Sequence, residues 1–132
     1  AVSDFKPAYI NKNKIKKNSK ISEIKIEKNT DILSYLGKNN RFKPKLLVGF
    51  SAETEDLIKN SINKLQEKFC DIIVANDVSK KEIGFNSELN EVTIIDKNGK
   101  IQKIKKNSKK FIASIIAKKI VDTFLLNEKS LN

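Results

Sequence analysis

Two short apolar runs separated by a helical pattern constrain the fold of this chain more than any other feature. The runs are KLLVGF (45–50) and DIIVA (71–75), and both have the length and composition of strands buried on both faces. We expect a helix to begin at Thr54 between them. Its apolar residues recur at helical spacing, and they are Leu57, Ile58, Ile62, Leu65 and Phe69. A strand, a helix and a strand with short links form a right-handed crossover, so the two strands should be parallel, with the first one central in the sheet.

The segments that follow this unit predict a hairpin and a closing helix. Residues 91–96 and 100–104 alternate around Asn98-Gly99, which predicts an edge hairpin with a type I′ turn. Residues 108–126 predict an amphipathic helix. Its expected buried side consists of Phe111, Ile112, Ile115, Ile116, Ile120 and Phe124. The fold class is therefore α/β, with a mostly parallel sheet flanked by helices, in a single domain over residues 1–132.

The segments that precede the unit are shorter and more polar. We expect the end of a strand over residues 1–4, a lysine-rich loop to Lys20, and a half-exposed strand over residues 22–27. A short helix over residues 31–36 should follow, with Thr30 as its cap and Gly37 as its stop.

The composition excludes several kinds of active site. The chain has no histidine and one cysteine, so it cannot build a Ser-His-Asp triad, a Cys-His pair or a zinc site from its own side chains. Its four glycines form no G-x-G-x-x-G or Walker loop. Cys70 is expected to be a buried thiol in a reducing, cytoplasmic compartment. The longest apolar stretch is interrupted by Lys118, Lys119 and Asp122, so we expect no membrane span.

The formal net charge of +11 leaves a polyanion-binding module open as an alternative function. However, Arg41 is the only arginine among the 27 basic residues, whereas the recognition of phosphates and base edges favours the bidentate guanidinium group. We therefore interpret the charge as a lysine-rich solvated surface, and nucleic acid is not an expected partner.

Polar or aromatic residues follow each of three strand-like runs. They are Asp4, Phe50 with the SAET that follows it, and the pair Asn76 and Asp77. Ligands of open parallel sheets bind beyond the carboxyl ends of the strands, where these side chains should converge. Each residue taken alone also fits an ordinary turn.

Two groups of lysines could hold a polyphosphate. Lys64 and Lys68 lie four residues apart on the predicted helix, hence on one face, and could hold a triphosphate between them. Lys14, Lys16 and Lys17 could close over an anion as a flap. In both cases ordinary solvated lysines remain the alternative.

Six motifs in order resemble the C-terminal portion of the phosphopantothenate-cysteine ligase family. They are AVSDFKP (1–7), NKIKK (13–17), KNTDIL (28–33), VGFSAET (48–54), DIIVANDVS (71–79) and GFNSELNEVTII (84–95). In most bacteria this ligase is fused behind a flavin-dependent decarboxylase. The resemblance implies a Rossmann-like fold, of which this chain lacks the N-terminal half, and a part in coenzyme A biosynthesis.

The chemistry that the resemblance implies is a ligation in two steps. The carboxylate of 4′-phosphopantothenate attacks the α-phosphate of CTP, and the amine of cysteine then displaces CMP from the acyl-cytidylate. Magnesium is expected on the triphosphate, with no metal ligands from the chain, and FMN only if a decarboxylase domain is present elsewhere in the full protein. The family also implies a homodimer, so a dimerisation module without activity of its own is a further alternative.

The resemblance also assigns the site residues. The nucleotide contacts carried over are Asp4, Lys14, Thr30, Asp31, Ile32, Leu33, Phe50, Lys64 and Lys68. Lys14 is the expected catalytic residue, which stabilises negative charge during the attack by cysteine. Asn76 and Asp77 are further candidates for a wall of the site, with no role assigned to either.

Overall fold

The computed structural model describes residues 2–14, 23–79 and 87–129. By its internal contacts the chain divides into two units, Ala1–Ile32 and Leu33–Asn132, and each is described by itself. In the described residues, no helix is long and apolar enough to cross a lipid bilayer.

The first unit is built around a two-stranded antiparallel ribbon. Strand β1 (Phe5–Pro7) pairs with β2 (Ile26–Lys28), with Phe5 opposite Lys28. The expected strand end at residues 1–4 is wrong for residues 2–4, and the expected strand at 22–27 begins only at Ile26. Ala1 and Ser22 lie outside the described residues. Ile24 and Ile26 are exposed, because a ribbon of two strands has no second layer that could cover an apolar face.

Helix α1 (Ile32–Lys38) continues through the glycine that was expected to end it. It also begins one residue later than predicted, so Asp31 rather than Thr30 directly precedes it. Gly37 is buried inside the helix, and a Cβ atom there would lie 1.9 Å from the carbonyl oxygen of Lys68. The glycine therefore permits a close approach of two backbone segments, which the local sequence does not reveal.

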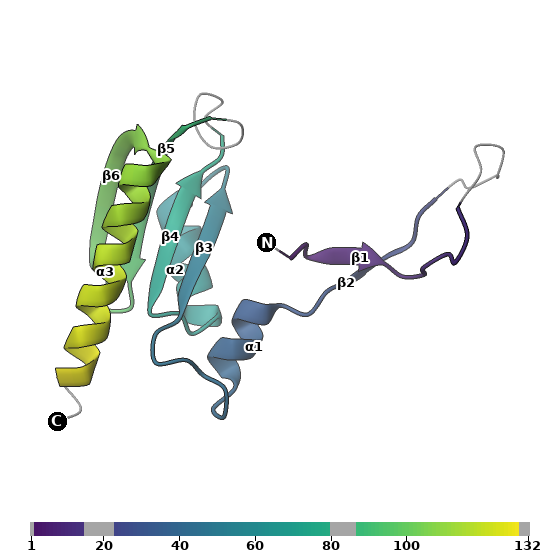
Figure 1. Cartoon of the computed structure of the whole chain (residues 1–132), viewed down its shortest axis with the longest axis horizontal. Helices are drawn as coiled ribbons and strands as arrows, with labels where there is room; N and C mark the ends of the chain where they lie inside the picture. The colour runs from purple at the N-terminus through teal and green to yellow at the C-terminus, as the bar shows by residue number, and fades with distance from the viewer. Residues whose placement is uncertain (1, 15–22, 80–86, 130–132) are drawn as a thin grey trace. The chain divides into compact units, whose positions relative to one another are not determined.

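The second unit contains a four-stranded sheet in the order β3-β4-β5-β6 (Figure 1). The strands are β3 (Val48–Glu53), β4 (Ile72–Asp77), β5 (Leu89–Asp96) and β6 (Ile101–Ser108). Strands β3 and β4 are parallel and joined through α2 (Leu57–Glu67), which confirms the predicted crossover. The pairings of β4 with β5 and of β5 with β6 are antiparallel, so the described sheet is mixed.

The prediction that the first apolar run forms a central strand is wrong for the described sheet, where β3 is an edge strand. The run does not enter the sheet as a unit. Leu47 packs in the core before the strand begins, whereas Phe50 is 63% exposed. The fully buried strand is β4, in which residues 72–75 are at most 1% exposed.

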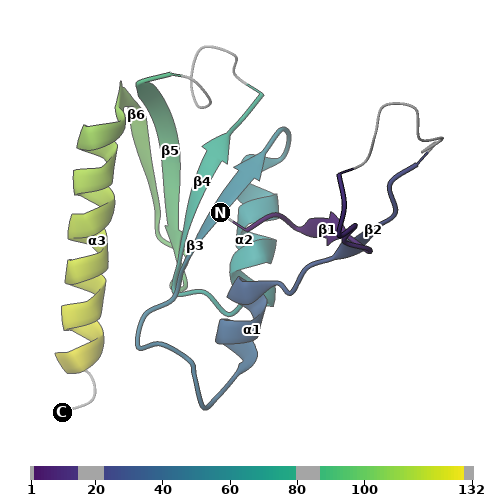
Figure 2. The same cartoon turned by 45° about the vertical axis from the view of Figure 1, so that its right-hand side comes forward.

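Each face of the sheet is covered by one helix (Figure 1 and Figure 2). Alternate residues of β4 face opposite sides: Ile73 packs in the cluster covered by α2, and Ile72 in the cluster covered by α3 (Lys109–Lys129). The predicted contacts of α2 through Leu57, Ile58, Ile62 and Leu65 are confirmed, as are those of α3 through Ile112, Ile115, Ile116 and Ile120.

Three aromatic residues that were expected on buried helix faces are exposed instead. Helix α2 ends at Glu67, and Phe69 follows it in a left-handed conformation with φ 55°. Phe111, which precedes the buried Ile112, is exposed and is not part of the core cluster that α3 covers. Phe124 lies one turn beyond Ile120, where the Nζ of Lys45 sits 5.7 Å from the centre of its ring.

The hairpin of β5 and β6 is confirmed, but its predicted type I′ turn is wrong. Gly99 has φ +80°, whereas Asn98 has no positive φ. The Gly99 N–H donates to the Asp96 carbonyl (2.9 Å), and the Asp96 N–H donates to the Lys100 carbonyl (3.1 Å). This is a type I turn followed by a left-handed glycine. The Asp96 carboxylate stabilises it by accepting the N–H groups of Asn98 and Lys100.

Candidate functional site

Phe50 and Asn76 lie on the same face of the sheet, Phe50 in the middle of β3 and Asn76 near the carboxyl end of β4. Phe50 is opposite Val74 in the parallel register and Asn76 is opposite Ala52, so the two side chains are diagonal neighbours. Helix α3 packs against β5 and β6 and leaves this part of the face open. The structure therefore brings together two residues that the sequence predicted for one site.

The open part of this face is a hollow of about 380 Å³, which we call the β3–α3 hollow. Its polar lining comes from Asn76, Asn90 and Lys109, the first residue of α3. The remaining lining is aromatic and aliphatic, and consists of Phe50, Val92, Ile112, Ala113, Ile116, Ala117 and Ile120. An exposed aromatic ring beside a few polar donors suits a small ligand that has both a flat apolar part and oxygen atoms.

Sequence reasoning missed Asn90, which is the partner of Asn76. The Nδ2 of Asn90 donates to the Oδ1 of Asn76 over 2.8 Å, between β5 and β4. The Oδ1 of Asn90 accepts the N–H of Glu91 at 2.9 Å, next to a β-bulge between Asn90 and Val92. The only sequence signal is an asparagine that opens an alternating strand, and the contact itself depends on the register between strands.

Lys64 lies on the opposite face, where it is held by β3. Its Nζ is 3.5 Å from the Oε1 of Glu53 and 3.4 Å from the Oγ of Ser51. The Ser51 hydroxyl donates to the same Glu53 oxygen. The Glu53 side chain is 18% exposed and that of Lys64 35% exposed, so the ion pair is partly shielded from water. An anion that binds Lys64 would compete with Glu53, a partner that the spacing of the lysines did not reveal.

Lys64 and Lys68 are linked by a backbone hydrogen bond at the end of α2. Lys68 follows the last residue of α2, and its N–H donates to the Lys64 carbonyl over 3.0 Å. The two lysines are therefore one helical turn apart. Whether they hold a triphosphate stays a prediction.

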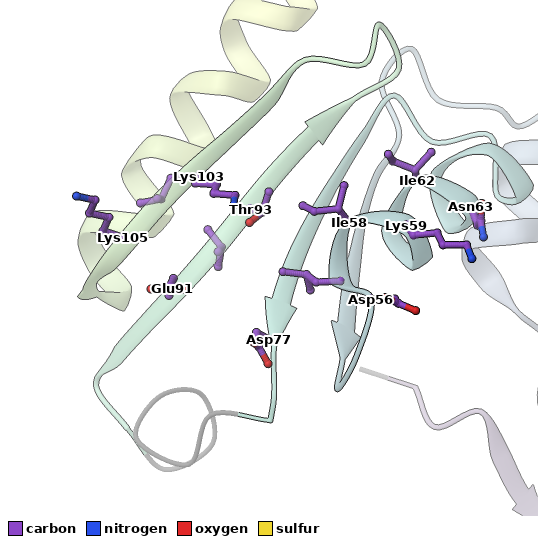
Figure 3. A pocket seen from close by; sticks show the side chains of 13 residues that line it. Asp56, Ile58, Lys59, Ile62, Asn63, Asp77, Glu91, Thr93, Lys103 and Lys105 are labelled. Atoms are coloured by element: carbon purple, nitrogen blue, oxygen red, sulfur yellow. The ribbon is translucent and has the colours of Figure 1, made fainter.

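Asp77 and Asn76 line different hollows, and a role for the two in a wall of one site stays a prediction. Successive residues of a strand face opposite sides, and Asp77 lines a second hollow of about 890 Å³ on the α2 face (Figure 3). Figure 3 shows Lys59 of α2 and Lys103 of β6 at the rim of this hollow together with Asp77. The Oδ1 of Asp77 accepts the N–H of Ser79 at 3.1 Å, which fits a role in the turn after β4.

In the first unit, hydrogen bonds of Asn29 place the predicted residue Asp4 close to the chain neighbour of Thr30. The carbonyl of Asp4 accepts the N–H of Asn29 at 2.8 Å, and the Nδ2 of Asn29 donates to the carbonyl of Ser3 at 2.7 Å. Asp4 therefore lies beside the residue that precedes Thr30. Lys14 is exposed. The rest of the expected flap, Lys16 and Lys17, lies outside the described residues.

The predicted nucleotide contacts are divided between the two units. Those in the first unit are Asp4, Lys14, Thr30, Asp31 and Ile32, and those in the second are Leu33, Phe50, Lys64 and Lys68. Leu33 is partly buried and packs against the core cluster that α2 covers. A single site formed by all nine residues stays a prediction.

The residues that the structure describes contain no cluster of three carboxylate or thiol side chains that could hold a metal ion.

The chain is similar to known proteins in both sequence and structure. Residues 1–124 match the family described as the DNA/pantothenate metabolism flavoprotein C-terminal domain. A cysteine/cysteine sulfinic acid decarboxylase from an unknown prokaryotic organism is 40% identical over 121 residues, which cover 92% of this chain and 33% of that protein. The coenzyme A biosynthesis bifunctional protein CoaBC of Borreliella burgdorferi is also 40% identical over 121 residues, which cover 89% of this chain and 29% of that protein.

A solved structure shows the same fold. The crystal structure of the C-terminal domain of a coenzyme A biosynthesis bifunctional protein CoaBC is similar with a TM-score of 0.69 and 31% identity, over 98% of this chain and 52% of that one. This chain thus spans a third or less of the length of the curated relatives above.

Proposed function

Because the chain belongs to the DNA/pantothenate metabolism flavoprotein C-terminal domain family, we propose that it is the nucleotide-binding part of a phosphopantothenate-cysteine ligase in coenzyme A biosynthesis. In the proposed reaction, a carboxylate oxygen of 4′-phosphopantothenate attacks the α-phosphorus of CTP and pyrophosphate leaves. The amine of cysteine then attacks the acyl carbon, CMP leaves with the bonding electrons, and the amine loses a proton as the amide forms.

The observation that carries this proposal is the β3–α3 hollow at the carboxyl end of a parallel strand-helix-strand unit. Nucleotides bind at this position in open α/β sheets. The exposed ring of Phe50 offers a surface on which a base can stack, and such stacking contributes about 1–3 kcal/mol. The amide of Asn76 lies beside it.

Lysines supply the charge that the reaction needs. Lys64 lies on the opposite face from Phe50, so the triphosphate would pass around the edge strand β3, and Lys64 and Lys68 would then bind its β- and γ-phosphates as point charges. Lys14 would stabilise the charge that develops on the acyl-phosphate as cysteine attacks. Such chemistry depends on positioning and charge neutralisation, so a chain without histidine can carry it.

Cofactors and partners follow from the same proposal. Magnesium would bind with CTP, held mainly by the phosphates, and FMN would be needed only by a decarboxylase domain elsewhere in the full protein. Phosphopantothenate and cysteine would be the other substrates, and a homodimer the working assembly. A cytoplasmic location would suit these soluble metabolites.

Calorimetric titration of the chain with CTP and magnesium tests the proposal. We expect saturable binding that is stronger for CTP than for ATP and is weakened roughly tenfold by Phe50→Ala, the effect of losing one stacked base. Phe42→Ala is the matched control, because Phe42 is also an exposed phenylalanine but lies in the loop before β3. Equal losses in both variants, or no binding by the wild type, would contradict the proposal.

A second titration tests the lysine pair. The double variant Lys64→Ala with Lys68→Ala should weaken CTP roughly tenfold or more while CMP, which lacks the β- and γ-phosphates, changes less than about twofold. The double change Lys103→Ala with Lys105→Ala removes the same charge from β6 and serves as control. A parallel loss of CTP and CMP affinity would refute the assignment of these lysines to the outer phosphates.

A further inference from the structure

Two hydrogen bonds fix which way the side-chain amide of Asn76 faces. The N–H of Glu91 is a backbone group that can only donate, so the Asn90 atom that meets it at 2.9 Å must be the amide oxygen. The other end of the Asn90 amide is therefore its NH2 group, which donates to Asn76 at 2.8 Å. The atom of Asn76 that accepts this bond must be its oxygen. The NH2 group of Asn76 therefore takes no part in the bond to Asn90 and can donate to another acceptor.

Asn76 is one of the residues that line the β3–α3 hollow. In the part of the chain that the structure describes, no protein atom accepts a hydrogen bond from the Asn76 Nδ2. The other polar side chain of the lining outside the asparagine pair is Lys109, which is a donor as well. The hollow thus presents donors beside the Phe50 ring, and a ligand that fills it must supply acceptor atoms.

We propose that Asn90 is a positioning residue that holds the Asn76 amide with its NH2 group toward the β3–α3 hollow, so that the site selects a ligand with an oxygen or ring-nitrogen acceptor next to Phe50. The ligand class is a nucleotide whose base or sugar-phosphate supplies that acceptor, and in this respect the inference rests on the proposed function. The orientation of the amide itself rests only on the two hydrogen bonds.

Exchanging Asn90 for aspartate tests the proposal with a change of one group. In Asn90→Asp, one carboxylate oxygen can still accept the Glu91 N–H, but the other cannot donate to Asn76. The Asn76 amide must then turn over, donate its NH2 group to Asp at position 90, and face the hollow with its oxygen. We expect the affinity for magnesium-CTP to fall roughly 10- to 100-fold, because an acceptor then meets an acceptor.

The chain offers a matched control at Asn107, directly opposite Asn90 in the β5–β6 ladder. The Oδ1 of Asn107 also accepts the N–H of the next residue, Ser108, at 2.9 Å. The variant Asn107→Asp therefore adds the same charge and retains the same local bond, but lies outside the hollow lining. We expect it to change CTP affinity less than about twofold. Thermal unfolding of both variants shows whether either effect comes from loss of structure.

The NMR signals of the Asn76 side-chain amide report its orientation directly. They would not respond to nucleotide if the contact with Asn90 served only the stability of the fold. The NH2 cross-peaks of Asn76, identified by their loss in Asn76→Asp, should shift on addition of magnesium-CTP in the wild type. Without nucleotide, one of them should move downfield in Asn90→Asp, because the NH2 group becomes the donor between the strands. Unchanged Asn76 cross-peaks in the free variant would overturn the assigned orientation.

The outcomes separate this inference from the proposed function. If the wild type binds CTP and Asn90→Asp binds it equally well, the inference is overturned while the proposed function stands. If the wild type does not bind CTP, the proposed function is overturned, and so is the proposal that the hollow selects a nucleotide. The amide cross-peaks of the free protein then test the orientation of Asn76 separately.

Discussion

At the end of the sheet where β5 turns into β6, two buried carboxylates accept hydrogen bonds and form ion pairs. At the opposite end, polar side chains line an open hollow. Asp71 accepts the buried N–H of Leu47 at 2.8 Å and pairs with Lys97 at 2.8 Å. Asp96 pairs with Lys119 at 2.8 Å and also accepts two backbone N–H groups of the turn. These carboxylates tie loops and helix α3 to the sheet.

At the opposite end of the sheet, polar side chains leave hydrogen-bonding groups without a protein partner among the described residues. Asn76 keeps a free NH2 group in the part of the chain that the structure describes, and the Phe50 ring is exposed beside it. On the other face Lys64 has only a partly shielded partner in Glu53. Polar groups that are satisfied indicate a structural role, and polar groups that are left available beside an exposed ring indicate a binding role.

The largest expected effect is at the closed end. Asp71→Ala leaves the N–H of Leu47 buried without an acceptor and removes the partner of Lys97, so we expect the free energy of unfolding to fall by about 3 kcal/mol. Urea unfolding measures this. Asp122→Ala removes an exposed carboxylate from α3 and should change stability by less than about 0.5 kcal/mol. A loss at Asp71 no larger than that of the control would break the comparison.

A smaller effect is expected from the ion pair at the open end. Glu53→Gln removes the negative charge that competes with phosphate for Lys64, so the affinity for CTP should rise roughly threefold to tenfold. The neighbouring change Glu55→Gln, on an exposed side chain, controls for net charge. Calorimetry at two salt concentrations measures both. A weaker affinity for CTP in Glu53→Gln would show instead that Glu53 holds Lys64 in place for binding.

The smallest expected effect is the pH dependence contributed by Asp96. Burial alone would raise the pKa of this carboxyl, but the bonds from Lys119 and from the N–H groups of Lys100 and Asn98 outweigh burial and hold the pKa below its usual 3.8. A lowered pKa in the folded state means that Asp96 stabilises the fold above about pH 4 and that this contribution is lost as the pH falls through the lowered value. The stability difference between wild type and Asp96→Asn should therefore shrink below pH 4, measured by urea unfolding. A difference that stays constant down to pH 2 would contradict this role.

The sequence predicted those parts of the fold that depend on local pattern. The crossover, the buried strand β4, the hairpin and the closing helix all follow from periodicity and turn residues. The role of Gly37 was missed because it depends on the Lys68 carbonyl, which is distant in the chain. The turn type was missed because the Asp96 side chain stabilises a type I turn where the Asn-Gly pair alone favours type I′.

The same distinction holds for the site. Phe50 and Asn76 could be predicted because each follows an apolar run that is recognisable in the sequence. Their partners could not: Asn90 meets Asn76 only through the register of β4 and β5, and Glu53 meets Lys64 only because α2 packs over β3. The sequence also did not show that Asn76 and Asp77, as successive residues of a strand, line hollows on opposite faces of the sheet.

Backbone amide shift mapping with magnesium-CTP tests the central claim most directly, because it compares the two ends of the sheet in one experiment. We expect saturable shifts at Phe50, Asn76 and Asn90, and none at Asp71 or Asp96. Shifts centred on Asp71 and Asp96, or the absence of shifts at the β3–α3 hollow at saturating CTP, would contradict it.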